Sequence, residues 1–216
     1  MVQQSIHKVH HIKELAGNAF IIRFDRGSFD FQPGQYINIS LANDTEIREY
    51  SIYSSIHDPF LEVLIKEVHG GYLSRKLKKL KKGNLLYIEG PFGYFLLPEK
   101  AQSVKNFFIA TGTGISPFHC FTLSYPQLKY TLLHGVQTAT YAYERECYMA
   151  DQYILCTSKE KTGAFGGRVS DFLRLQNIDP SAYYFLCGNC DMIYEVHDIL
   201  IDAQVSTEHI FAEVYF

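Results

Sequence analysis

The segment Arg48 to Ser51 places a cation, an aromatic ring and a hydroxyl group within a short stretch of chain. It opens the alternating run REYSIYSS, which predicts a β-strand. On a strand, Arg48 and Tyr50 project from one face and Ser51 from the other. A guanidinium can bind a diphosphate through paired charge-assisted hydrogen bonds, and a tyrosine ring can stack on a planar heterocycle. The pattern suits a dinucleotide cofactor, although an ordinary half-exposed strand face carries the same residue types.

Several further motifs follow this segment in order along the chain. They are Lys66-Glu67-Val68, Gly70-Gly71-Tyr72-Leu73-Ser74, Gly90-Pro91-Phe92-Gly93-Tyr94-Phe95, Thr111-Gly112-Thr113-Gly114-Ile115-Ser116-Pro117, Cys187-Gly188-Asn189 and Glu213-Val214-Tyr215-Phe216. In that order and at those spacings, the set resembles the ferredoxin-NADP reductase family. The resemblance covers nearly the whole chain and involves several independent motifs.

The resemblance implies that a first domain binds FAD and that a second domain binds NADP. In the first domain it makes Arg48 the diphosphate clamp, and Tyr50 the ring that stacks on the isoalloxazine. It makes Ser51 the hydroxyl near the flavin nitrogen that takes the hydride. Gly71 and Ser74 are expected to form a second diphosphate contact. The candidate cofactor-binding residues of this domain are Arg48, Glu49, Tyr50, Ser51, Lys66, Gly71, Tyr72, Leu73 and Ser74.

In the second domain the resemblance makes Gly112 to Gly114 the diphosphate loop of the nicotinamide cofactor. Cys187 is expected to help set the nicotinamide beside the flavin. Glu213 and Tyr215 match a C-terminal Glu-x-Tyr, whose tyrosine covers the other flavin face. The implied catalytic residues are Ser51, Cys187, Glu213 and Tyr215. The candidate cofactor-binding residues of this domain are Thr111, Gly112, Thr113, Gly114, Gln137, Ser158, Lys159, Arg168, Cys187, Gly188, Tyr215 and Phe216.

Phe216 adds an aromatic residue after that tyrosine, which is similar to the bacterial flavodoxin/ferredoxin reductases. The resemblance implies that such a ring packs on a folded-back adenine of FAD. The alternative is that the Tyr215-Phe216 pair fills an apolar groove.

The choice between NADP and NAD depends on cations for the 2′-phosphate of NADP. Gln137 stands where reductases of this kind often have arginine, which counts against NADP. Ser158, Lys159 and Arg168 match other positions that hold the phosphate in the family. We therefore predict NADP, with NAD as the alternative if Lys159 and Arg168 are ordinary solvated charges.

Hydrophobic patterning predicts two different architectures in the two halves of the chain. The pattern of residues 6–95 predicts six short strands separated by turn residues. Such a run indicates an antiparallel sheet closed into a barrel. From Val104, apolar strands alternate with helical stretches, one of them through Tyr141 to Met149, and this pattern is typical of a doubly wound parallel α/β sheet. The polar run LLPEKAQS separates the halves, so we expect domains at residues 1–100 and 101–216.

One helix is expected inside the first half, over Gly71 to Leu80, because Leu73, Leu77 and Leu80 recur at helical spacing. Its first backbone N–H groups are suited to a phosphate. The same helix carries the basic run Arg75 to Lys82. This run is either a solvated helix face or a docking patch for an acidic redox partner.

Composition excludes several classes of protein. The formal net charge of -3 argues against a general nucleic-acid binder. No apolar run approaches the ~20 residues of a membrane span, and the N-terminal segment lacks the apolar core of a signal peptide. We expect a cytoplasmic monomer without nucleic-acid or membrane partners.

The chain has five cysteines, which fits a reducing compartment better than a disulfide framework. Cys187 and Cys190 form a C-x-x-C that suits a redox pair or half of a zinc site. No second pair completes a tetrahedral set, so we predict no metal.

The function implied by the resemblance is hydride transfer from NADPH to FAD, followed by electron transfer to a small acidic carrier, either ferredoxin or flavodoxin. The first alternative is an NADH-preferring reductase component of an oxygenase, or a flavin or cytochrome reductase. The second alternative is a regulatory module that keeps FAD for sensing. A sensor is expected to lose the hydride-transfer residues, but Ser51, Cys187, Glu213 and Tyr215 are all present.

Overall fold

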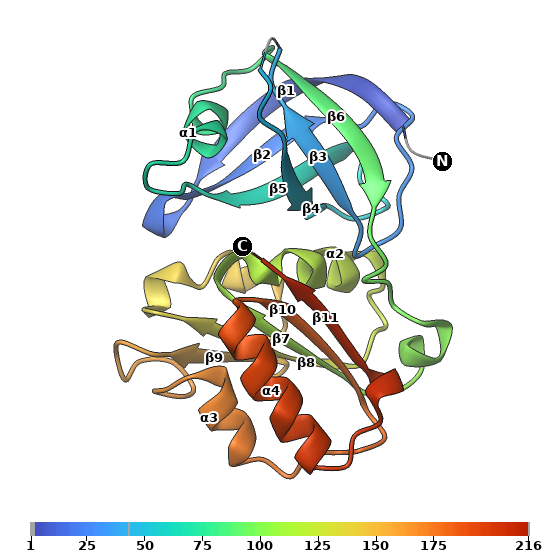
Figure 1. The fold of residues 1–216 in the computed structure, drawn as a ribbon, viewed down its shortest axis with the longest axis vertical. Helices are drawn as coiled ribbons and strands as arrows, with labels where there is room; N and C mark the ends of the chain where they lie inside the picture. Colours follow the sequence, from blue (N-terminus) through green and yellow to red (C-terminus); the bar gives the residue numbers. More distant parts are fainter. Residues whose placement is uncertain (1–2, 43, 216) are drawn as a thin grey trace. The chain divides into compact units, whose positions relative to one another are not determined.

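The computed structural model describes residues 3–42 and 44–215 (Figure 1). The chain divides into two compact units. The first, here called the barrel unit, comprises Met1–Leu96 and Ser116–Pro126. The second, here called the α/β unit, comprises Leu97–Ile115 and Gln127–Phe216.

The barrel unit contains a six-stranded antiparallel sheet in the order β4-β3-β6-β1-β2-β5. Its strands are β1 (Gln3–Glu14), β2 (Ala19–Asp25), β3 (Tyr36–Ser40), β4 (Arg48–Ser51), β5 (Phe60–Lys66) and β6 (Leu85–Phe92). An isolated antiparallel bridge between Ile52 and Val63 joins the two ends of this order. The sheet is therefore a nearly closed barrel, as the run of short strands predicted.

Burial on β3 follows the two-residue period of a strand. Ile37 and Ile39 are fully buried, and the residues that alternate with them, Tyr36, Asn38 and Ser40, are half-buried. The inward residues join a single apolar cluster that fills the barrel. This alternation fixes the register of β3, because a shift by one residue would turn the buried isoleucines to the outside.

Two helices belong to the barrel unit. The first is α1 (Leu73–Lys78), which lies within the segment expected to be helical and buries Leu73 and Leu77. The second is α2 (Ser116–Ser124), where Cys120 joins the barrel cluster and the Phe121 ring stacks on Phe95 at 6.1 Å between centroids. The expected boundary at residues 100 and 101 lies near the break after Leu96, but strand-helix alternation does not reveal that α2 packs with the barrel.

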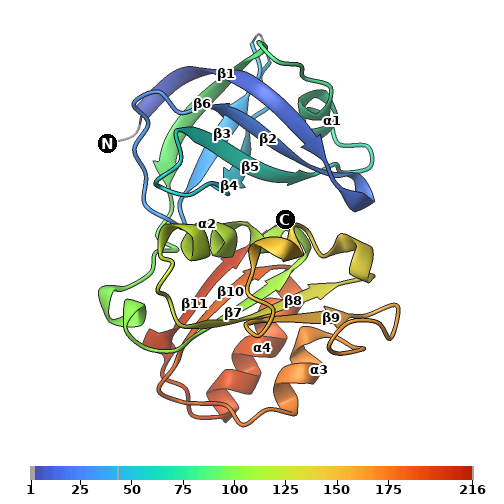
Figure 2. The ribbon, with the colours of Figure 1, turned by 180° about the vertical axis from the view of Figure 1, so that it is seen from behind.

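The α/β unit is built on a five-stranded parallel sheet in the order β11-β10-β7-β8-β9. Its strands are β7 (Asn106–Thr111), β8 (Tyr130–Val136), β9 (Tyr153–Thr157), β10 (Tyr183–Gly188) and β11 (Ile210–Val214). Figures 1 and 2 show α3 (Val169–Arg174) and α4 (Cys190–Asp202) on the same face of this sheet. Both helices bury apolar residues in the cluster that includes Ile109 and Leu186 of the sheet. The predicted parallel α/β architecture is thus confirmed.

The expected helix from Tyr141 to Met149 is wrong. Two short 3-10 turns lie there instead, η4 (Ala139–Tyr141) and η5 (Arg145–Cys147). Glu144 between them has a φ of 46°, in the left-handed region, which interrupts a right-handed helix. The remaining 3-10 turns are η1 (Ala16–Asn18), η2 (Glu99–Gln102), η3 (Gly112–Ile115) and η6 (Thr207–His209).

Candidate functional site

The β4 strand separates its side chains as the sequence predicts. Tyr50 pairs with Ile37 and Arg48 with Ile39, so both lie on the face of those two core residues. Glu49 pairs with Asn38 on the opposite face. The Tyr50 ring packs against the barrel cluster, and burial raises the pKa of Tyr50 to about 12, so its hydroxyl stays neutral. Ser51, the last residue of the strand, is buried.

The Arg48 guanidinium is exposed and contacts two residues that precede it in the chain. Its Nη2 lies 2.7 Å from Glu46 Oε2, and its Nη1 donates to the carbonyl of Ile47 at 2.7 Å. The side chains of the ion pair are 60% and 39% exposed for Arg48 and Glu46. An exposed ion pair contributes only about 0–1 kcal/mol, so a diphosphate can replace the carboxylate at this cation. Sequence reasoning missed Glu46, although an acidic residue two positions before the arginine was a visible signal.

The Gly70 to Ser74 turn contains the residues predicted for the second diphosphate contact. Gly71 N–H donates to the Val68 carbonyl at 2.8 Å, and Val68 N–H donates to Ser74 Oγ at 3.2 Å. A Cβ on Gly71 would lie 3.0 Å from Ser74 Oγ, so a larger residue would press on this hydroxyl. The turn therefore fixes the Ser74 hydroxyl at the start of α1. Because α1 has only six residues, its dipole adds little to the predicted phosphate contact, which depends on these polar groups.

The other predicted residues of this unit have different roles. Leu73 is buried in the barrel cluster and anchors α1. Lys76 lies over the exposed Tyr72 ring, 3.8 Å from its centroid, and its ammonium lies 3.0 Å from Asp44 Oδ2. Lys66 ends β5 as an exposed residue.

In the α/β unit, two loops meet through their backbones at the carboxyl ends of β7 and β10. A Cβ on Gly114 would lie 2.3 Å from the Cys187 carbonyl oxygen. A Cβ on Gly188, where φ is 128°, would lie 2.3 Å from Thr111 Oγ1. Asn189 N–H donates to the same Thr111 oxygen at 2.9 Å. The segment from Thr111 to Gly114 is therefore held against β10 at a distance that only glycine allows.

Three predicted catalytic residues lie together in this unit. Cys187 pairs with Glu213 across β10 and β11, and its Sγ lies 4.0 Å from Glu213 Oε2. Tyr215 N–H donates to the Gly188 carbonyl at 2.8 Å, which fixes the chain just after β11. Burial, and next the Glu213 carboxylate, raise the pKa of Cys187 well above its usual value. The thiol is therefore neutral and can donate to Glu213.

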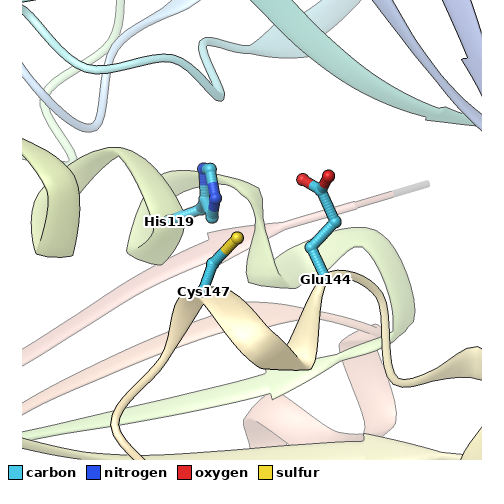
Figure 3. A group of neighbouring side chains, drawn as sticks. All are labelled: His119, Glu144 and Cys147. Atoms are coloured by element: carbon cyan, nitrogen blue, oxygen red, sulfur yellow. The ribbon is translucent and has the colours of Figure 1, made fainter.

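This neutral thiol argues against a redox role for Cys187 and Cys190, because such pairs need a readily formed thiolate. The cysteines in the described part of the chain are all free. Figure 3 labels Glu144, which precedes η5, and Cys147, its last residue, in the α/β unit, and His119 of α2 in the barrel unit. Because His119 belongs to the barrel unit, we assign no metal site to these residues.

The predicted 2′-phosphate residues are only partly brought together. Ser158 N–H donates to the Val136 carbonyl at 3.0 Å, and Lys159 N–H donates to the Gln137 carbonyl at 2.9 Å. Gln137, Ser158 and Lys159 thus lie on adjacent loops after β8 and β9. Arg168 precedes α3, and its Nη1 lies 3.3 Å from Glu195 Oε1 on α4. Phe216 lies outside the described residues.

Comparison with known proteins finds similarity along nearly the whole chain. Residues 7–96 match the family model described as an oxidoreductase FAD-binding domain. The chain is 26% identical over 234 residues to a flavodoxin/ferredoxin-NADP reductase of Buchnera aphidicola, covering 94% of this chain and 92% of the relative. It is 29% identical over 230 residues to a ferredoxin-NADP reductase of Azotobacter vinelandii, covering 91% and 88%.

One longer relative has a different name. The chain is 31% identical over 230 residues to the phenol hydroxylase P5 protein of Acinetobacter pittii, covering 96% of this chain but 62% of the relative.

Among solved structures, a Neisseria gonorrhoeae ferredoxin NADP+ reductase superposes with a TM-score of 0.88 at 18% identity, covering 99% of each chain. An Amycolatopsis cytochrome P450 reductase superposes with a TM-score of 0.87 at 22% identity, covering 99% of this chain and 70% of that one. These two likenesses establish the fold.

An FAD-binding barrel joined to a parallel α/β unit defines a flavin-dependent oxidoreductase. Residues 7–96 match an oxidoreductase FAD-binding domain, and the chain is similar along nearly its whole length to ferredoxin-NADP reductases. The resemblance seen in the sequence motifs is therefore confirmed. No helix among the described residues is long and apolar enough to cross a bilayer.

Proposed function

We propose that this protein transfers electrons between NADPH and a small one-electron carrier protein. The observation that carries the proposal is the grouping of Cys187, Glu213 and Tyr215 at the ends of β10 and β11. The Thr111 to Gly114 segment is held against the same end of β10. A sensor that only retained FAD would have no need of this arrangement.

The residues of the barrel unit fit FAD. The exposed Arg48 guanidinium suits a diphosphate, the neutral Tyr50 ring suits a planar heterocycle, and the Ser74 hydroxyl is fixed by the backbone. When bound, FAD accepts a hydride from a reduced nicotinamide and gives up its electrons singly. We assign Arg48 and Ser74 to binding the diphosphate, Tyr50 to orienting the flavin ring, and Ser51 to hydrogen bonding at the ring.

The residues of the α/β unit fit a nicotinamide dinucleotide. Gly112 and Gly114 have no side chains that would cover the backbone of this segment, so a diphosphate can approach it. The neutral Cys187 thiol and the Glu213 carboxylate supply a donor and an acceptor at one place. We assign these two groups to orienting the nicotinamide, and Tyr215 to competing with it for the same space.

NADP is the proposed cofactor because Ser158 and Lys159 follow β9 next to Gln137. The ion pair between Arg168 and Glu195 supports the alternative of NADH, since it reduces the positive charge available for a phosphate. Relatives named as electron transfer components of toluate and anthranilate dioxygenases agree with this second candidate, an oxygenase reductase. The chain spans 33% and 58% of their lengths.

The proposed electron acceptor is a small acidic carrier such as ferredoxin or flavodoxin, as the names of the two full-length relatives suggest. Within the basic run from Arg75 to Lys82, Lys78 pairs with Glu67 at 2.9 Å and Lys76 with Asp44. These two lysines therefore have internal partners, and the remaining cations of the run are the proposed docking charges. We further propose that the protein acts as a cytoplasmic monomer.

Stopped-flow spectroscopy of the FAD-loaded protein tests the proposal. NADPH should bleach the flavin absorbance faster than NADH, and reduced protein should be reoxidised by ferredoxin or flavodoxin. Faster reduction by NADH would favour the oxygenase-reductase alternative. Failure of both nicotinamides to reduce the flavin would contradict electron transfer altogether.

A further inference from the structure

His134 is a buried histidine in the middle of an apolar strand. It lies on β8 with no exposed surface, and both ring nitrogens have partners. Nε2 lies 2.9 Å from the Gly112 carbonyl oxygen, and Nδ1 lies 2.7 Å from the Tyr153 hydroxyl on β9. The histidine thus connects two strands of the sheet to the segment that follows β7.

The partners of His134 determine its tautomer. A carbonyl oxygen can only accept, so Nε2 carries the hydrogen and donates to Gly112. Nδ1 is then the acceptor for the Tyr153 hydroxyl. Burial lowers the pKa of His134 to about 4, against a smaller opposing effect of the Gly112 carbonyl. The imidazole is therefore neutral at physiological pH, with one donor and one acceptor, both engaged.

The Tyr153 side chain is itself held in place. Its ring stacks on that of Tyr148 at 5.4 Å between centroids, and the Arg145 guanidinium lies 5.7 Å from its centroid. Tyr153 and His134 meet edge to face at 5.9 Å. Packing therefore limits the rotation of both rings. The His134 Nε2 atom that donates to Gly112 is held in one position as a result.

Gly112 is the weakly packed part of the Thr111 to Gly114 segment. A Cβ at Gly114 would collide with β10, whereas a Cβ at Gly112 would meet nothing within 4 Å. Gly112 has a φ of 54°, one of the several conformations that glycine adopts at similar energy. The Gly112 peptide begins the 3-10 turn η3, and the hydrogen bond from His134 is the side-chain contact that adds to this backbone restraint.

We propose that His134 is a positioning residue that fixes the Gly112 carbonyl and so sets the conformation of the segment that receives the nicotinamide cofactor. The Gly112 carbonyl and the Thr113 N–H belong to one planar trans peptide, so they point in opposite directions. Holding the carbonyl toward His134 turns the Thr113 N–H away from the sheet. This proposal rests on the proposed binding of a nicotinamide cofactor by the segment.

Two substitutions of similar polarity separate this role from simple packing. In His134→Gln the side-chain amide reaches as far as Nε2 and keeps a donor for Gly112. In His134→Asn the amide reaches only as far as Nδ1, so the Gly112 carbonyl loses its side-chain partner. Tyr153→Phe removes the hydroxyl but keeps the ring stack. Leu132→Ala serves as the control for stability, because Leu132 is buried on the same strand two residues away.

Isothermal titration of each FAD-loaded full-length variant with NADP+ gives the first measurement. His134→Asn should raise the Kd about five- to tenfold, the equivalent of one hydrogen bond. His134→Gln should stay within about twofold of the wild type, and Tyr153→Phe should fall between the two. Leu132→Ala should lower the Tm without changing the Kd.

Hydrogen exchange without any nicotinamide gives the second measurement. The backbone amides of residues 112–114 should exchange faster in His134→Asn than in His134→Gln, while FAD occupancy stays equal. Equal Kd values and equal exchange in the Asn and Gln variants would overturn the positioning role while leaving the proposed function intact. A wild-type protein that binds neither NADP+ nor NAD+ would overturn the proposed function together with this inference.

Discussion

The two units present their candidate cofactor-binding residues in opposite ways. In the barrel unit, the exposed Arg48 guanidinium is held by the Glu46 carboxylate, an ion pair that a ligand can replace. In the α/β unit, Gly114 and Gly188 allow two stretches of backbone to meet where no side chain fits. The first region uses exchangeable charges and the second uses close backbone contact. The two regions should therefore fail under different substitutions and respond differently to salt.

The largest expected effect comes from adding one methyl group to the α/β unit. In Gly114→Ala the new Cβ would overlap the Cys187 carbonyl, so the segment must move away from β10. We expect NADP+ binding to weaken roughly 100-fold, equivalent to about 3 kcal/mol. Titration calorimetry of the FAD-loaded protein measures the loss, and the flavin absorbance should show that FAD is retained.

Gly112→Ala is the matched control in the same segment. Its Cβ would meet no atom, and only the positive φ of 54° opposes it. A cost of about 1–2 kcal/mol for that backbone conformation corresponds to about a five- to thirtyfold loss. If both alanine variants lose the same affinity, close contact with β10 is not what distinguishes Gly114.

The next effect tests the charged region. Arg48→Ala should weaken FAD binding by about 1.5–3 kcal/mol, because it removes a charge-assisted contact to the diphosphate. Titration of the apoprotein with FAD, followed by flavin fluorescence, gives the Kd. Arg48→Lys should recover part of the loss, and the advantage of wild type over Arg48→Ala should shrink as salt rises. An apoprotein that takes up no flavin with Arg48 intact would contradict the assignment of this site.

The sequence predicted the barrel well because its signals are local. Period-two alternation and turn residues mark each strand, and the grouping of α2 with the barrel is the feature that they miss. That grouping depends on Cys120 and Phe121 packing against residues far away in the chain. The failed helix at Tyr141 has a similar cause, since no local pattern reveals the left-handed conformation of Glu144.

The candidate site was predictable where motifs are short and contiguous. The placement of Cys187 beside Glu213 follows from the pairing of two parallel strands. His134 was not recognised, because a single histidine in an apolar strand is most often a core residue. One partner, Gly112, follows β7, and the other, Tyr153, lies on β9, so both are distant in the sequence. The ion pair between Glu195 and Arg168, which would compete with a phosphate for the arginine, likewise cannot be predicted without the folded structure.

A smaller effect separates the two candidate cations for the 2′-phosphate. Arg168 is engaged by Glu195, whereas Lys159 follows β9 beside Gln137. We expect Lys159→Ala to raise the Michaelis constant for NADPH about tenfold and that for NADH less than about twofold. Arg168→Ala should change the NADPH value less than about threefold, since its charge is already partly neutralised. Steady-state kinetics with both cofactors gives the comparison, and equal effects on NADPH and NADH would exclude a phosphate site at Lys159.

The smallest expected effect has the opposite sign and concerns Glu46. Its carboxylate must leave Arg48 before a diphosphate can bind there, and it would also repel the diphosphate. Because the pair is exposed, its loss should tighten FAD binding only about two- to fivefold in Glu46→Gln. Glu49→Gln removes the same charge from the strand face that Glu49 shares with Asn38, and it should leave the Kd for FAD nearly unchanged. Fluorescence titrations at low salt and at 1 M salt, where screening acts within about 3 Å, should show the gain from Glu46→Gln disappearing. Weaker FAD binding in Glu46→Gln would instead mean that the carboxylate orients Arg48 for its ligand, and the barrel unit would then depend on a fixed arrangement as the α/β unit does.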